Sequence, residues 1–228
     1  MTGPVLILAG GYEFEPYGHD QEAPVPQSLP FLAKVHELMG YDAAILTPLE
    51  EHALAAAKTP LPKGFTLVDT VKTRVLKVGD ADIGLVMAPP LKSERMPPSL
   101  EEMNAVIDAA KALKPKVKLL IALTPWGIVP EKQLIDLGAG VFHVVLGSGQ
   151  GSGLTGRLDA DGRTAWVRAF MKGKALSEIR ILAWPEGDDF KWISNQTVLF
   201  GAKALDDRYP EDQAVVDMLR PLNQEQTR

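Results

Sequence analysis

The sequence predicts an α/β (α+β) protein in which two mixed β-sheets pack as a sandwich flanked by helices. Strand-like apolar runs alternate with helix-like patterns over the first two thirds of the chain, and the last third is a run of strands joined by tight turns. The dipeptides Gly79-Asp80 and Asp161-Gly162 are typical of two-residue hairpins, so some neighbouring strands are expected to be antiparallel. The sheets should therefore be mixed.

The first half of the chain is expected to begin with a strand. Val5–Ala9 is a continuous apolar run closed by two glycines, which predicts a fully buried, central strand. A proline-rich loop over Tyr12–Gln27 follows. Apolar residues then recur at helical spacing before Gly40. The expected elements are a helix over Leu29–Met39, a strand over Ala43–Leu46, a helix over Glu50–Ala57 and a hairpin of Thr73–Val78 with Ile83–Ala88.

The second half begins with a helix start signal. Ser99 precedes Glu101 and Glu102, which combines a capping residue with carboxylates where the helix dipole favours them. The elements expected from here are a helix to about Leu113, a strand over Val117–Leu123, a helix over Glu131–Leu137, strands over Val141–Leu146, Leu154–Leu158, Thr164–Phe170, Glu178–Ala183 and Trp192–Phe200, and a short helix near Asp212–Leu219.

Length, composition and charge exclude several classes of function. The 228 residues are 46% hydrophobic, which suits a single domain over residues 1–228. A net charge of -5 without a basic stripe argues against nucleic acid as a partner. No apolar run is long enough to span a membrane, and the N-terminus lacks the basic region of a signal peptide. We expect a cytoplasmic protein, or a periplasmic one if a signal peptide was removed. The absence of cysteine excludes thiol nucleophiles and Cys-ligated metals.

Four sequence blocks, in order and with fitting spacing, carry a resemblance to a known family. They are GGYEFEP at Gly10–Pro16, GYDAAILTPLEE at Gly40–Glu51, IALTPWG at Ile121–Gly127 and HVVLGSGQG at His143–Gly151. The chain resembles the calcineurin-like metallophosphoesterases of the 5′-nucleotidase superfamily. The resemblance implies an α/β sandwich, two metal ions at the strand ends and hydrolysis of phosphate esters. The family's C-terminal nucleotide-recognition domain has no counterpart in this sequence.

The positions at which the family holds its metal ligands carry other residues here. The aligned residues are Ala9, Gly11, Pro48, Leu49, Pro125, Gly149 and Gly151, none of which binds a divalent cation through its side chain. The family's segment with the bridging aspartate also has no counterpart, because Leu38–Tyr41 joins the helix directly to the next strand. We therefore expect a degenerate member without a metal cofactor, acting as a non-catalytic binding or partner subunit at the former active-site face.

The ligand-binding candidates at that face are Gly10, Gly11, Trp126, Ser148, Gly149, Gln150 and Gly151. The glycine-rich segment Gly147–Gly153 is either a loop that binds an anion through its backbone N–H groups or a remnant of the family's metal-binding loop. Trp126 either lines a pocket or interface, or is a core residue. The partner is expected to be a protein or a small anionic ligand.

Two alternatives stay open at this stage. Relocated ligands, with His19, Glu50 and His52 as candidates, would make the chain a metal-dependent phosphohydrolase, although Glu50 and Glu51 also suit a helix start. The glycine loop would make it a metal-free anion or nucleotide binder. Ser148 and Ser152 have no evident Ser-His-Asp arrangement, and His143 is expected to be structural.

Overall fold

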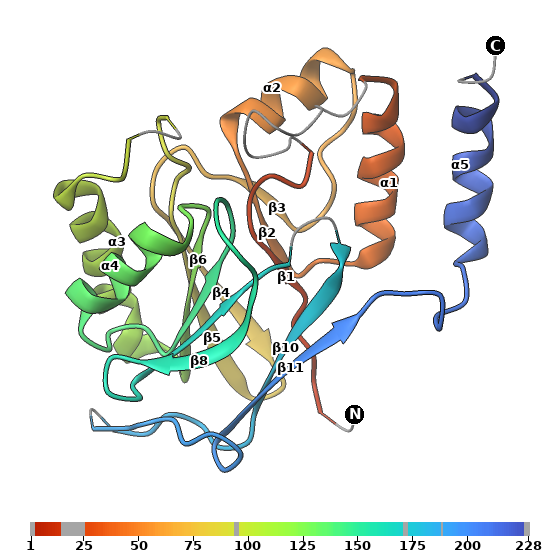
Figure 1. Ribbon diagram of the computed structural model, residues 1–228. Helices are drawn as coiled ribbons and strands as arrows, with labels where there is room; N and C mark the ends of the chain where they lie inside the picture. Colours follow the sequence, from red (N-terminus) through yellow and green to blue (C-terminus); the bar gives the residue numbers. More distant parts are fainter. Residues whose placement is uncertain (1–2, 15–25, 94–95, 171–172, 188, 226–228) are drawn as a thin grey trace.

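The larger sheet has the strand order β4-β5-β6-β7-β9-β8, of which β4, β5, β6 and β8 are labelled in Figure 1. This computed structural model describes residues 3–14, 26–93, 96–170, 173–187 and 189–225. The strands are β4 (Lys72–Val78), β5 (Ala81–Met87), β6 (Leu119–Thr124), β7 (Val144–Gly147), β8 (Leu154–Asp159) and β9 (Thr164–Arg168). β5, β6, β7 and β9 run parallel, while β4 and β8 pair antiparallel at the two edges. The predicted mixed sheet is therefore confirmed.

A second layer of strands covers the inner face of this sheet. It contains a parallel sheet of β1 (Leu8–Ala9), β2 (Ala43–Leu46) and β3 (Phe65–Leu67), and an antiparallel ribbon of β10 (Ala175–Ile181) and β11 (Val198–Ala204). Ile45 from β2 and Val198 from β11 belong to the same buried cluster as Leu85 and Ile121 of the larger sheet. The two layers therefore share one apolar core, as the predicted sandwich requires.

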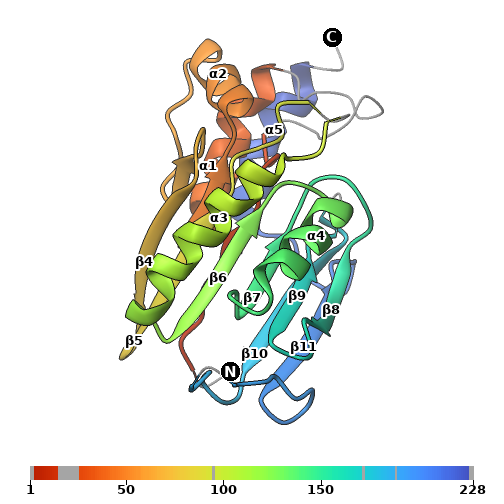
Figure 2. The same cartoon turned by 90° about the vertical axis from the view of Figure 1, so that its left-hand side faces the viewer.

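Helices cover both outer faces of the sandwich. α3 (Leu100–Leu113) and α4 (Ile128–Gly138) lie across the larger sheet (Figure 2). α1 (Leu29–Met39) and α2 (Pro48–Ala56) cover the small parallel sheet, and α5 (Gln213–Glu225) lies beside α1 (Figure 1). Short 3-10 turns occupy Pro26–Ser28 and Lys114–Lys116. The order of layers is helix, sheet, sheet, helix.

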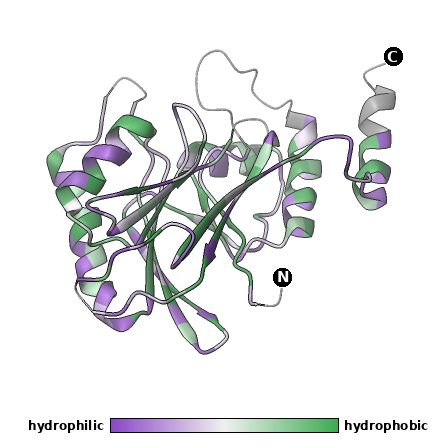
Figure 3. Ribbon diagram, turned by 60° about the horizontal axis from the view of Figure 1, so that its bottom comes forward, coloured by the Kyte–Doolittle hydropathy of each residue, from purple (hydrophilic) through white to green (hydrophobic). Residues whose placement is uncertain are grey.

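Alternation along the strands explains why both faces of the larger sheet need cover. In β5, Ile83, Leu85 and Met87 point into the core between the sheets, whereas Val86 points toward α3. Both faces of a parallel strand are therefore apolar, which matches the hydrophobic colouring of the inner strands in Figure 3. In the part of the chain that the structure describes, no helix is long and apolar enough to cross a membrane.

The first strand is a correction to the sequence analysis. The run Val5–Ala9 predicts a fully buried central strand, but β1 contains only Leu8 and Ala9, pairs with β2 alone, and leaves Val5 59% exposed. The Asp42 carboxylate accepts a hydrogen bond from the Ile7 N–H at 2.8 Å, and the Asp42 N–H donates to the Ile7 carbonyl at 2.9 Å, so Asp42 holds the residue just before β1 through both its side chain and its backbone. Apolar content alone therefore gave the wrong position for this strand.

The last strand is a second correction. Trp192–Phe200 has a strand-like apolar pattern, but β11 starts only at Val198, and β3 has no counterpart in the sequence analysis. Asn195 has a left-handed φ of 63°, which breaks an extended chain at this point. Trp192 is buried from outside any strand, and its Nε1 donates to the His143 carbonyl at 2.8 Å. The apolar pattern of Trp192–Phe200 therefore indicates that these residues are largely packed against the core, and it does not indicate a strand over the whole range.

Candidate functional site at the strand ends

The carboxyl ends of β1, β2, β6 and β7 meet at one edge of the sandwich. Parallel strands place the loops that follow them at the same edge, which is where α/β proteins usually bind ligands. A Cβ built on Gly10 would lie 2.3 Å from Ser148 Oγ, and one on Gly11 would lie 3.2 Å from Thr47 Cγ2 and 3.4 Å from Pro125 Cβ. The four strand ends therefore pack closely against one another, and the two residues that lie between them, Gly10 and Gly11, have no side chain.

Glu50 holds the loop that follows β1. Its Oε1 accepts the Phe14 N–H at 2.9 Å and its Oε2 accepts the Thr47 N–H at 2.8 Å, while Thr47 Oγ1 accepts the Glu50 N–H at 3.2 Å. The side chain is fully buried at the start of α2. Burial raises the pKa of Glu50, and the hydrogen bonds from the backbone act against this shift. The carboxylate is thus used as a helix cap and a loop anchor.

Glu13 is the second carboxylate of this region, and it lies beside Glu50. Burial raises the pKa of Glu13 to about 7, and the negative charge of Glu50 contributes in the same direction. Burial also lowers the pKa of His36, which forms a hydrogen bond with the Glu13 backbone. His36 is packed among aromatic rings, with centroid distances of 4.9 Å to Phe14 and 5.7 Å to Tyr41. Protons on partly exposed Glu13 and on buried His36 therefore change the charge of a region packed with aromatic rings.

Arg168 organises the glycine loop after β7. Its Nη2 donates to the carbonyls of Ser148, Gly149 and Gln150 at 3.3, 3.1 and 3.0 Å, and its Nε donates to the Ser152 carbonyl at 3.1 Å. The Gln150 carbonyl also accepts the Ile128 N–H at the start of α4. One buried guanidinium thus fixes the conformation of the whole loop.

A buried carboxylate neutralises Arg168. Glu131 Oε2 lies 2.5 Å from Arg168 Nη1 and accepts a hydrogen bond from Trp166 Nε1 at 3.0 Å. Both charged side chains are at most 1% exposed. Burial raises the pKa of Glu131 to about 7, against the opposing effect of Arg168. The pair supports the glycine loop from below and offers no open charge to a ligand.

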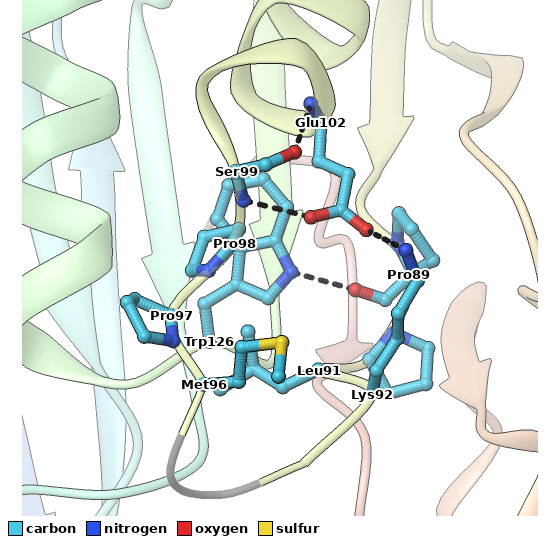
Figure 4. A pocket seen from close by; sticks show the side chains of 10 residues that line it. Pro89, Leu91, Lys92, Met96, Pro97, Pro98, Ser99, Glu102 and Trp126 are labelled. Carbon is cyan, nitrogen blue, oxygen red and sulfur yellow. Dashed lines mark hydrogen bonds and ion pairs between the residues drawn. The ribbon is translucent and has the colours of Figure 1, made fainter.

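Trp126 borders a small pocket beside this edge (Figure 4). Its ring is 2% exposed, and Nε1 donates to the Pro89 carbonyl at 2.6 Å. Both interpretations of Trp126 from the sequence therefore have a counterpart in the structure, because the side chain is a core residue that also lines a cavity.

The candidate site residues lie in neighbouring parts of this edge of the sandwich. Gly10, Gly11 and Ser148 lie together at the strand ends, and Gly149 packs against the Pro125 carbonyl. Gln150 and Gly151 contact the start of α4. Trp126 lies below them in the pocket wall. The sequence therefore identified residues of one region, although it did not reveal that they contact each other so closely.

The relocated metal ligands are not brought together. His19, with Asp20 and Glu22, lies outside the described residues. Glu50 is buried and occupied by backbone N–H groups, whereas His52 is exposed. Residues two positions apart on a helix do not face one another, so Glu50 and His52 point in different directions. Over the described ranges, no group of three or more His, Asp or Glu side chains is arranged to hold a metal ion.

The two metal ions that the resemblance implies do not fit the residues present. Gly149 and Gly151 have φ angles of 75° and 113°, which a histidine rarely adopts. A Cβ at Gly149 would lie 2.4 Å from the Pro125 carbonyl oxygen, and one at Gly151 would lie 2.8 Å from Ile128 Cγ2. The backbone at these positions is therefore shaped for glycine and not for a ligating side chain.

His143 is structural, as expected from its place before β7. Its Nδ1 accepts the Leu120 N–H at 2.9 Å, and burial lowers its pKa to about 4. The sequence analysis missed Glu13, Glu131 and Arg168 altogether. Glu131 and Arg168 are 37 positions apart and each looks like an ordinary surface residue, so no local pattern could have paired them.

Comparison with known proteins gives the fold. No protein-family profile matches the chain, and no curated protein is similar to it in sequence. The chain is similar in structure to the sulfate thiohydrolase SoxB of Thermus thermophilus in complex with glycerol, with a TM-score of 0.59 and 16% identity over 97% of this chain and 43% of SoxB. It thus spans less than half the length of SoxB.

Two further solved structures are more distant. A hypothetical protein from Thermus thermophilus has a TM-score of 0.37 and 12% identity over 63% of this chain and 69% of its own. A novel phosphatase from Mycoplasma pneumoniae has a TM-score of 0.35 and 13% identity over 75% of this chain and 73% of its own. Both TM-scores are too low to show a shared fold. The likeness to SoxB is one of fold, and the chain has a metallophosphoesterase-like α/β fold.

Proposed function

We propose that this chain is a non-catalytic protein with a metallophosphoesterase-like fold, and that it binds a protein partner at the strand-end face. The observation that carries the proposal is the direct packing of Gly10 on Ser148 and of Gly11 on Thr47 and Pro125. Two-metal hydrolysis needs cations roughly 3.5–4 Å apart, each surrounded by side-chain donors. Here the corresponding residues bring neither the donors nor the space.

Exposed apolar side chains at the same end favour a protein as the partner. Leu49 follows β2, Met96 and Leu100 follow β5, and Val129 follows β6, and all four are at least 60% exposed. Single exposed apolar residues are ordinary, but several on adjacent connections are typical of an interaction surface. Their location on the connections that would otherwise surround an active site supports binding at that face.

Metal content and turnover test the proposal. The protein is purified without chelator and without a metal-affinity tag, bound Mn, Fe and Zn are measured, and hydrolysis of p-nitrophenyl phosphate and of 5′-nucleotides is assayed with added Mn²⁺. We expect substoichiometric metal and no turnover above the buffer control. Stoichiometric metal together with turnover would refute the proposal and favour relocated ligands, in which case His19→Ala and Glu50→Ala should abolish activity.

A second candidate, a metal-free anion binder, is favoured by one feature of the glycine loop. In a planar trans peptide the C=O and the following N–H point in opposite directions. Because the carbonyls of residues 148–150 point toward Arg168, the N–H groups of Gly149, Gln150 and Gly151 point away from it. Successive backbone N–H groups form an anion site where they converge on one ligand, so this candidate requires the three N–H groups to turn toward a common anion.

Amide chemical shifts test this second candidate. Titration with phosphate and with sulfate, at ionic strength held constant with chloride, should shift the amide signals of Gly149, Gln150 and Gly151 in a saturable way and raise the melting temperature by mass action. Shifts that chloride reproduces equally would reject the anion site. That result would leave the protein partner as the remaining proposal.

A further inference from the structure

A cavity of about 170 Å³ lies where the connection after β5 meets the start of α3 (Figure 4). The segment from Pro89 to Lys92 forms one wall, the segment from Met96 to Glu102 forms the other, and Trp126 also lines the cavity. Cavities for cofactors and drug-sized ligands are roughly 300–1,000 Å³. This one is the size of a single large side chain.

The polar groups of the lining are already paired with each other. Trp126 Nε1 donates to the Pro89 carbonyl, the Ser99 N–H donates to Glu102 Oε2 at 2.7 Å, and Ser99 Oγ accepts the Glu102 N–H at 3.2 Å. Glu102 Oε1 lies 2.8 Å from Lys92 Nζ. An apolar occupant leaves all of these interactions in place, and the single indole N–H donor of Trp126 is already used by Pro89.

Two proline pairs make the cavity walls stiff. Pro89-Pro90 and Pro97-Pro98 stand on opposite walls, have fixed φ angles and offer no backbone N–H to a ligand. Binding at such walls loses little conformational entropy, because they are ordered before the partner arrives. The cavity walls are therefore stiff at these four positions, and none of the four prolines donates a backbone hydrogen bond to a peptide strand.

The rim of the cavity is acidic. Within the described part of this connection, the carboxylates of Glu101 and Glu102 face one ammonium group, that of Lys92, whose pKa is raised by the hydrogen bond to Glu102 and also by Glu101. Glu101 lies on the exposed first turn of α3. One negative charge is left over, so a cationic group beside the cavity is electrostatically favoured.

We propose that this cavity binds one large aliphatic side chain of a protein partner, and that a lysine or arginine lies next to that side chain in the partner. The inference rests on the proposed function and names the contact through which the partner is held. The apolar anchor supplies most of the binding energy, as buried anchors at interfaces do, and the basic neighbour meets Glu101.

Peptide titrations test the proposal on the full chain. The probe is N-acetyl-Lys-Leu-Lys-amide, and the readouts are the Trp126 indole N–H and the Leu91 methyl signals in NMR spectra. We expect saturable shifts with the leucine peptide, none with the same peptide carrying serine in place of leucine, and weaker binding when both lysines are glutamate. Equal shifts with the serine peptide, or shifts that map elsewhere, would refute the apolar anchor.

Matched variants separate the cavity from general surface effects. Met96→Ala removes part of the wall and should weaken leucine-peptide binding by roughly 5-fold, about 1 kcal/mol. Met39→Ala, at the exposed end of α1, should leave it unchanged. Glu101→Gln should weaken binding at low salt, and Glu51→Gln in the first turn of α2 should not. Equal effects of the members of either pair would overturn the assignment.

The outcome also distinguishes this inference from the proposed function. If the protein binds metal and hydrolyses phosphate esters, the non-catalytic role is refuted. The peptide titration still tests whether the cavity binds an apolar side chain. A metal-free, inert protein whose Trp126 signal never moves refutes the cavity alone. If Met96→Ala abolishes a dimer in sedimentation velocity, the occupant is a second copy of this chain and the partner assigned here is wrong.

Discussion

At the scale of single residues, the strand-end region contains acids whose protons matter for stability. Glu13 has a pKa near 7 in the folded protein, against 4.5 for an ordinary glutamate. A carboxyl whose pKa is raised on folding contributes stability below pH 4.5, and that contribution is lost as the pH rises through 7. His36 and His143, whose pKa values are lowered by burial, act in the opposite sense as the pH falls below 6.5.

Glu13→Gln isolates the first of these effects. Relative to the wild type, the free energy of unfolding of the variant should rise by roughly 1–3 kcal/mol between pH 4.5 and pH 8, because glutamine never ionises. Urea denaturation across this range measures the difference, and subtraction removes the contributions of the histidines and of Glu131. Glu37→Gln, on the exposed face of α1, controls for loss of a surface carboxylate. A difference that does not change with pH would contradict the assignment.

Arg168→Met should be among the most damaging single changes. It leaves Glu131 buried without its cation, which costs about 3–5 kcal/mol at pH 8. The loss should be smaller at pH 5, where Glu131 can be protonated, and smaller again in the double variant Glu131→Gln/Arg168→Met. Hydrogen exchange of the amides of residues 149–153 should accelerate in the single variant. Unchanged exchange would mean that the loop does not depend on the guanidinium.

At the scale of elements, the two capping boxes set the starts of α2 and α3. The side chains of Thr47 and Ser99 each accept a hydrogen bond from the backbone N–H three residues later. The glutamate side chain at that later position accepts the backbone N–H of Thr47 or Ser99. Ser99→Ala should lower the free energy of unfolding by about 1 kcal/mol, and Thr47→Ala by up to about 2 kcal/mol because Thr47 is buried. Denaturation curves of the two variants, with Ser99→Thr as a control that keeps the cap, measure the difference. Equal losses would show that burial adds nothing to the cap.

The elements also show which patterns the sequence could predict. Helical spacing before Gly40 predicted α1 with its observed bounds, because the apolar repeat and the left-handed glycine at the end of the helix are local signals. β1 is shorter than Val5–Ala9 because Val5 and Ile7 are exposed and only Leu8 and Ala9 pair with β2. β11 starts later than predicted because Trp192 is buried from outside any strand. Arg168 could not be found, because its partners are separated from it in sequence and meet only through the pairing of β7 with β9.

At the scale of the whole molecule, the sandwich class was predictable and the strand order was not. The hairpin signals predicted β4-β5 and β8-β9 correctly, as local pairs. The parallel pairing of β7 with β9 passes over β8, and no local signal specifies such a crossover. The positions aligned with the family's metal ligands rest on the resemblance alone, and only the structure revealed how closely the strand ends are packed.

α5 provides a test of how far the cooperative unit extends. It lies against α1 outside the four layers, and its described side chains are at best partly buried. Removal of residues 212–228 should therefore lower the free energy of unfolding by no more than roughly 1–2 kcal/mol and leave one cooperative transition. Tryptophan fluorescence follows the core in both forms, because no tryptophan lies in the removed segment. A molten, non-cooperative product would place α5 in the core.

The glycine loop held by Arg168 also has a consequence for protein engineering. A designer who wished to install a metal centre at this edge would have to introduce side chains at Gly149 and Gly151, where the backbone is left-handed and already in contact with Pro125 and Ile128. Each replacement made alone costs stability before any ligand set is complete. The route to a metalloenzyme thus begins with several steps that are each unfavourable.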